Sequence, residues 1–157
     1  MNQRGHSWSN SFLAVVVATS NCRLLYGSGY GKSNNMKALS IVAPGGRRIA
    51  SGEKTLEVRR WKPTIGADED LLIVENGRFL RAEGDEDYEG KAVAIVRVGA
   101  FRPFVPEDLA AACGSYFEEG WLAWELMDVR PISSTISIRA ARGIYEIDPP
   151  SDMQLRS

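Results

Sequence analysis

Short apolar runs separated by turn signals recur along the chain from Met36 onward. Lys37 to Val42 predicts a first strand, which ends at the turn Ala43-Pro44-Gly45-Gly46. Arg47 to Ser51 has room for one helical turn, with Gly52 as its left-handed cap. The segment from Met36 onward is therefore predicted to begin with a strand and a very short helix.

The next segment, Thr55 to Trp61, alternates cleanly between the two faces of an extended strand. Leu56 and Val58 point one way. The residues that share the opposite face are Thr55, Glu57, Arg59 and Trp61.

A hairpin is predicted around Asn76-Gly77, because both residues tolerate the positive φ of a type I′ turn. Its arms would be Asp70 to Glu75 and Arg78 to Ala82. The acidic stretch that follows, Glu83 to Gly90, predicts a solvated loop.

The second half of the body continues with β-rich runs. Lys91 to Phe101 predicts a long strand, and Pro106 to Cys113 a short helix with proline and acids in its first turn. Trp121 to Leu126 and Gly143 to Ile147 supply the last strands. Many short strands with few helices favour a mainly β (α+β) fold, a small β-barrel with a few short helices.

Length and composition place this body in one domain. The chain has 157 residues, of which 44% are hydrophobic and 25% charged, enough for one core. Residues 1–35 are rich in Ser, Asn and Gly and contain no Asp or Glu. We interpret 1–35 as a flexible N-terminal extension or a non-native upstream segment, 36–150 as the folded domain and 151–157 as a C-terminal tail.

Two motifs in the N-terminal segment resemble functional signals and fail on closer reading. Phe12 to Ala18 is an apolar run at the minimum length for a secretory signal and far below the roughly 20 residues that span a bilayer. Gly27 to Ser33 resembles a phosphate-binding loop, but Tyr26 stands where the first glycine is needed. A flexible linker is the better interpretation of Gly27 to Ser33. No membrane partner is expected.

The charge balance excludes a global electrostatic mode of nucleic-acid binding. Net charge is −1, so any contact with nucleic acid must come from a local basic patch. The two cysteines, Cys22 and Cys113, favour a reducing, cytoplasmic setting. The single histidine, His6, lies outside the body, which argues against a Ser-His-Asp triad and a histidine metal site. No metal or other cofactor is expected.

One motif carries a specific signal: Gly52, Lys54, Glu57 and Arg59 form a Gly-x-Lys-x-x-Glu-x-Arg pattern at the entry to a strand. With the later strands in order, residues 36–150 resemble the ASCH domain family. The resemblance implies a small PUA-like β-barrel with a cleft for RNA or a nucleoside-like ligand, and a role in RNA metabolism.

The same residues make a binding site plausible on physical grounds. Glu57 and Arg59 share a strand face and Lys54 lies at its start, so two cations bracket one carboxylate. The alternative is a structural salt bridge. Thr55 is a further candidate ligand, or a residue present for its β-propensity.

Aromatic and basic residues extend this candidate site. Trp61 is the best candidate to stack a base. Trp121 is a further candidate, and Trp124 is more typical of a core residue. Arg130 is the leading phosphate contact, and the other cations are expected to help if they converge on a side that the acidic run Asp85 to Asp87 avoids. These other cations are Arg47, Arg48, Arg60, Lys62, Arg139 and Arg142.

Two functional classes follow. The first is a module that binds RNA or a nucleoside-like small molecule. The second is a small hydrolase, because some ASCH proteins are amidohydrolases acting on acetylated cytidine and others are linked to ribonuclease activity. In the amidohydrolases, a Thr follows the motif Lys by three residues, whereas this chain has Glu57 at that position. Lys54 and Glu57 would then act as an acid-base pair. Nothing in the sequence points to an oligomeric state.

Overall fold

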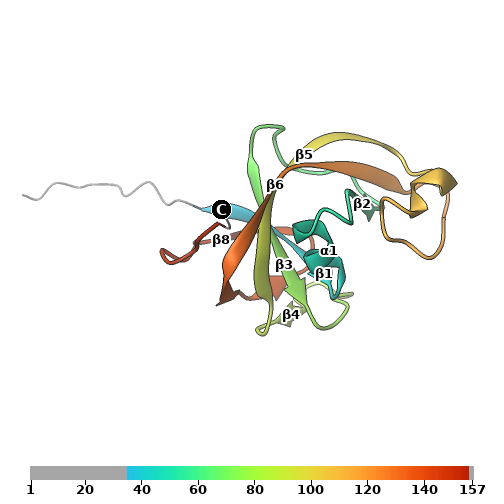
Figure 1. Ribbon diagram of the computed structural model, residues 1–157. Coiled ribbons are helices and arrows are strands. Elements are labelled where there is room, and N and C mark those ends of the chain that lie inside the picture. Colours follow the sequence, from blue (N-terminus) through green and yellow to red (C-terminus); the bar gives the residue numbers. More distant parts are fainter. Residues whose placement is uncertain (1–34, 156–157) are drawn as a thin grey trace, which may run out of the picture. The chain divides into compact units, whose positions relative to one another are not determined.

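The fold of residues 35–155, described here from a computed structural model, is dominated by β-strands (Figure 1). The two N-terminal motifs, at 12–18 and 27–33, lie outside the described residues. The elements in chain order are β1 (Met36–Val42), α1 (Gly45–Ala50), β2 (Leu56–Arg59), β3 (Asp70–Asn76), β4 (Glu86–Asp87), β5 (Lys91–Pro103), the 3₁₀ helix η1 (Pro106–Leu109), β6 (Leu122–Ser137), β7 (Ala140–Ala141) and β8 (Ile144–Ile147).

Six strands form one sheet in the order β2-β6-β5-β3-β1-β8, and β4 pairs with β7 in a second, two-stranded sheet. β1 and β3 are parallel, while the other neighbours in the large sheet are antiparallel. β2 and β8 are its edges and do not pair with each other in the part of the chain that is described. The mainly β prediction is confirmed, whereas a closed barrel is not seen.

Both faces of the central strands are buried, which explains their near-continuous apolar runs. One core contains Leu39, Leu71 and the fully buried Trp124, and the other contains Leu72 and Ala140. Leu71 and Leu72 are adjacent in β3 and point to opposite faces, as the period of two in a strand requires. Each fully buried leucine contributes roughly 1.5–3 kcal/mol by leaving water.

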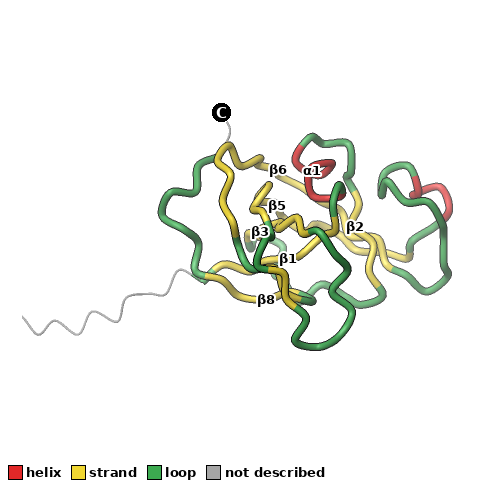
Figure 2. The backbone as a smooth tube through the Cα atoms, turned by 90° about the horizontal axis from the view of Figure 1, so that it is seen from below, coloured by secondary structure: helices red, strands yellow, loops and turns green. Residues whose placement is uncertain are grey.

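The helical turn after β1 forms as predicted. α1 spans Gly45–Ala50, and Gly52 follows it with φ +78°. Figure 2 shows this helix in red beside the strands. The helix packs closely on β3, since a Cβ added at Gly46 would lie 2.8 Å from the Cβ of Glu75. This close approach fixes the turn from which the signature segment starts.

The hairpin predicted at Asn76-Gly77 is wrong. β3 ends at Asn76, and residues 78–82 form no strand. The reason is that β1 and β5 already occupy both edges of β3. The side chain of Asn76 instead donates a hydrogen bond to the carbonyl of Arg78, which directs the chain into a loop.

Three other expectations are corrected in extent. The helix expected over Pro106 to Cys113 is limited to η1, followed by turns. The acidic loop contains β4, which pairs with β7. The strand expected over Trp121 to Leu126 continues to Ser137, because β6 pairs with β5 along most of its length. No helix among residues 35–155 is long and apolar enough to cross a membrane.

Candidate functional site

Lys54 is the most enclosed cation of the signature, with 7% of its surface exposed. Its Nζ donates to the carbonyls of Leu56 at 2.7 Å and Ala112 at 2.9 Å, and lies 3.2 Å from Oε2 of Glu57. Two of the three ammonium donors are used in these hydrogen bonds, and the contact with Glu57 is an ion pair. Lys54 therefore holds the start of β2 against the segment that follows η1.

Glu57 is bracketed by two cations, as the alternation of β2 predicts. It is 5% exposed, and its Oε1 lies 2.8 Å from Nε of Arg59. This contact is an ion pair without the alignment of a hydrogen bond, since Arg59 Nε has no hydrogen-bond partner among the described residues. Nη2 of Arg59 donates to the carbonyl of Ser40 at 3.0 Å, which ties β2 to β1.

A cleft of about 450 Å³ opens beside this triad. Its walls come from the end of β1, the start of α1, β2, the loop after β3, the segment after η1 and the turn before β8. Four cations line it against one carboxylate, although the whole chain has a net charge of −1. The four cations are Arg48, Lys54, Arg59 and Arg142. The local basic patch that the sequence analysis required is therefore present.

Three aromatic residues line the same cleft. Phe79 and Tyr116 are 68% and 60% exposed, and Trp121 is half-buried. Tyr116 and Trp121 meet edge to face, with ring centroids 5.4 Å apart, and the guanidinium of Arg60 lies 5.2 Å from the Trp121 ring. Phe79 and Tyr116 were not among the predicted site residues, and their only sequence signal is an aromatic side chain in a polar loop.

A second cleft, of about 880 Å³, shares Arg59, Trp121 and Arg142 with the first. It adds Trp61 and three acidic residues, two on the loop after β3 and one on β4. These acids are Glu83, Asp85 and Glu86. The expectation that the acidic run avoids the basic side is therefore wrong, because pairing of β4 with β7 brings it there.

Several predicted site residues lie elsewhere. Thr55 is exposed and lines neither cleft. Trp61 lines the second cleft, and its ring also packs edge to face on Trp124 with centroids 4.7 Å apart. Trp124 is fully buried, as predicted for a core residue. Trp121 is thus the tryptophan that lines both clefts.

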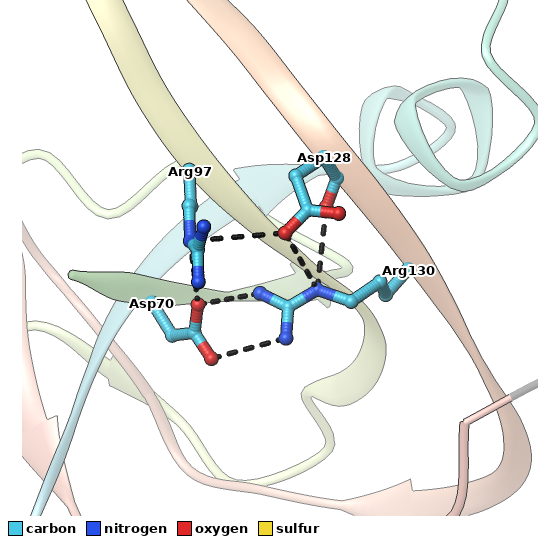
Figure 3. Close-up of polar contacts among 4 residues, drawn as sticks. All are labelled: Asp70, Arg97, Asp128 and Arg130. Atoms are coloured by element: carbon cyan, nitrogen blue, oxygen red, sulfur yellow. Dashed lines mark hydrogen bonds and ion pairs between the residues drawn. The ribbon is translucent and has the colours of Figure 1, made fainter. Parts of the chain in front are cut away.

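Arg130 belongs to a separate ion network on β3, β5 and β6 (Figure 3). Its guanidinium binds Asp70 through two hydrogen bonds, one of them 3.1 Å from Nη1 to Oδ2, and its Nε lies 3.3 Å from Asp128. Arg97 lies 3.4 Å from Asp70 and 3.7 Å from Asp128. Hydrogen bonding to Arg130 lowers the pKa of Asp70. Arg130 is therefore engaged in joining strands.

The other predicted cations are divided among several locations. Arg48 and Arg142 line the first cleft, and Arg60 lines the second. The remaining ones have partners away from the signature. Arg47 pairs with Glu75, Arg139 with Glu86, and Lys62 lies over the Phe101 ring.

The described residues contain no group of three or more His, Cys, Asp or Glu side chains placed to hold a metal ion. The clefts instead combine cations, aromatic rings and the Glu57 carboxylate. Such a set is suited to an anionic, planar ligand.

Comparison with known proteins gives a consistent family match. The profile of the ASCH domain family matches residues 39–136. The crystal structure of an ASCH protein from Zymomonas mobilis is similar, with 22% identity, a TM-score of 0.49, and coverage of 66% of this chain and 73% of that chain. Two single-residue mutants of that protein give 19% and 18% identity, TM-scores of 0.45 and 0.46, and coverage of 65% and 66% of this chain and 73% and 76% of theirs. No curated protein matches the chain.

Proposed function

The chain belongs to the ASCH domain family, and from its cleft we propose that it binds single-stranded RNA or a nucleotide. The observation that carries the proposal is the excess of four cations over one carboxylate in a cleft that exposes three aromatic rings. Phosphates are attracted by guanidinium groups, and base stacking on an aromatic side chain contributes roughly 1–3 kcal/mol per base. The PUA-like architecture, the cytoplasmic setting and a role in RNA metabolism are parts of the same proposal.

The cations of the cleft have different roles. Arg142 makes no ion pair among the described residues, and Arg48 has only a 3.6 Å contact with the exposed Glu53. Both guanidinium groups are therefore available to phosphate. Arg59 is held by Glu57 and by the carbonyl of Ser40, so it presents its remaining donors in a fixed direction.

The test is the salt dependence of binding to a short, fluorescently labelled single-stranded RNA. Arg142→Ala should weaken binding and reduce the slope of log K against log salt by about 0.7, the loss of one phosphate contact on a single strand. Lys91→Ala is the matched control, because Lys91 is exposed and lines neither cleft. Absence of RNA and nucleotide binding at low salt, or equal losses in both variants, would contradict the proposal.

The hydrolase alternative rests on one observation: the Glu57 carboxylate and the Lys54 ammonium lie 3.2 Å apart and both line the cleft. Against it, the Lys54 ammonium donates hydrogen bonds to two backbone carbonyls, which suits a group that positions Glu57 better than one that moves a proton. We therefore rank binding first.

Lys54→Arg separates these two functions, because arginine keeps the charge but does not release a proton at usable pH. Both proteins are assayed with acetylated cytidine and short RNA, following free acetate and strand cleavage, with RNA binding measured in parallel. We expect no turnover by the wild type and similar binding by both. An active wild type with a variant that binds but is about 10²–10⁴-fold slower would establish the hydrolase instead.

A further inference from the structure

Asn76 is a polar residue of the cleft that the signature does not include. It ends β3, is 3% exposed, and lines the cleft together with Phe79 and Arg142. Its Oδ1 is buried and has no hydrogen-bond partner among residues 35–155. Most buried side-chain acceptors have a partner, so an unpaired one beside a cleft is open to a donor from outside the described residues.

The orientation of the amide is fixed by its other end. Nδ2 of Asn76 donates to the carbonyl of Arg78. Turning the amide over would bring two carbonyl oxygens together and remove this bond. Asn76, a residue of the cleft wall, therefore has one unused acceptor, the buried Oδ1, and no unused donor beyond the second hydrogen of Nδ2.

An exocyclic amine is a base group that matches a lone acceptor. Cytosine presents N4–H₂ and adenine N6–H₂, whereas uracil and hypoxanthine carry a carbonyl oxygen at the corresponding position. A carbonyl oxygen facing Oδ1 would be repelled. Single-stranded bases can expose these edges to a protein while they stack on an aromatic ring, which Phe79 supplies in this cleft.

We propose that Asn76 is a specificity-determining residue that selects nucleobases bearing an exocyclic amino group. This inference rests on the proposed nucleotide-binding function and narrows it to amino-bearing bases such as cytosine and adenine. Because Oδ1 is screened from solvent, the base reaches it only when a neighbouring side chain of the cleft wall moves aside.

The experiment compares two matched pairs of nucleoside monophosphates by calorimetric titration at low salt: cytidine with uridine, and adenosine with inosine. The members of each pair share the phosphate and sugar; the keto member has an oxygen in place of the exocyclic amine and a hydrogen on the adjacent ring nitrogen. We expect the wild type to bind the amino member about tenfold more tightly in each pair, because at the exocyclic position the amine donates to Oδ1 whereas the keto oxygen is repelled by it. Equal affinities within both pairs would overturn the role of Asn76 and leave the proposed function standing.

The variants Asn76→Ala and Asn76→Leu remove the acceptor and should bring both ratios close to one while binding persists. Circular dichroism shows which variant is folded, and the ratios are read from that one. A folded variant that keeps the wild-type preference would overturn the inference. If neither variant folds, the wild-type ratios decide it. If the wild type binds none of the four nucleotides and no short RNA, the proposed function and this inference both fail.

Discussion

At the scale of single residues, the buried triad shows how charge is kept inside a small protein. Removing a carboxylate and an ammonium from water is unfavourable unless each finds several partners. Glu57 has a cation on both sides, and Lys54 adds two backbone carbonyls to its contact with Glu57. The signature is thus a structural unit as well as one wall of the cleft.

Replacing Lys54 with methionine should destabilise the protein strongly. Methionine is one atom shorter and apolar, so the carbonyls of Leu56 and Ala112 lose their buried donor and Glu57 loses one of its two cations. Breaking one partner of a buried pair costs about 3–5 kcal/mol. Urea unfolding measures this change in the free energy of unfolding. Lys62→Met is the control, since Lys62 is exposed, and a similar small loss in both variants would show that Lys54 does not stabilise the fold.

At the scale of elements, the β5–β6 pair connects the cores with the region of the cleft. The two strands pair from Lys91 with Ser137 to Pro103 with Leu122, with register irregularities between. Glycines lie at two close approaches. A Cβ at Gly90 would lie 2.4 Å from the backbone oxygen of Ile138, and one at Gly99 would lie 2.4 Å from Sδ of Met127.

These two glycines should respond differently to the same substitution. Gly90→Ala should lower the free energy of unfolding by about 2 kcal/mol or more, because a backbone carbonyl must move and Ile138 N is bonded to Gly90 O. Gly99→Ala should cost below about 1 kcal/mol, since Met127 is flexible and 52% exposed. Thermal unfolding of both variants provides the comparison. Equal shifts in melting temperature would show that backbone clash is not the deciding cost.

Local signals predicted local elements well. The first strand, the short helix capped by Gly52 and the alternation around Glu57 follow from turn chemistry and periodicity, and all are seen. The Asn76-Gly77 hairpin failed because strand pairing is decided by distant segments. A turn signal cannot show that both edges of β3 are already occupied.

In the candidate site, too, contacts between residues close in sequence could be predicted, whereas contacts between distant residues could not. Lys54, Glu57 and Arg59 lie close in sequence, so the period of a strand was enough to predict their contacts. The pairing of Arg130 with Asp70 has no local signal, because the two residues are 60 positions apart in the sequence. Asn76 was read only as a turn residue, since burial and an unpaired oxygen are properties of the assembled cleft.

At the scale of the whole molecule, several carboxylates of the described residues are held by hydrogen bonds, and two of them, Asp85 and Glu86, line the second cleft. Six of them have a lowered pKa, and in each the largest cause is a hydrogen bond from a side chain or a backbone N–H. They are Glu69, Asp70, Asp85, Glu86, Asp87 and Asp108.

Acid should therefore unfold the protein, and Asp108 provides the sharpest test. It is 8% exposed and binds Arg102 through two hydrogen bonds of 2.6 and 2.8 Å, which lower its pKa. As pH falls, the unfolded chain is protonated first, near pH 4, so the stabilisation is complete above about pH 5 and is lost as pH drops through the folded pKa.

Asp108→Asn should consequently be less stable than the wild type by about 1–2 kcal/mol at pH 7, and the difference should shrink as pH falls below about 4. Urea unfolding from pH 7 to pH 3 measures the difference. Asp68→Asn is the matched control, because Asp68 is exposed and makes no ion pair within residues 35–155, so it should follow the wild type throughout. A difference for Asp108→Asn that stays constant down to pH 3 would mean that the substitution acts through packing and that the charge of Asp108 does not stabilise the fold.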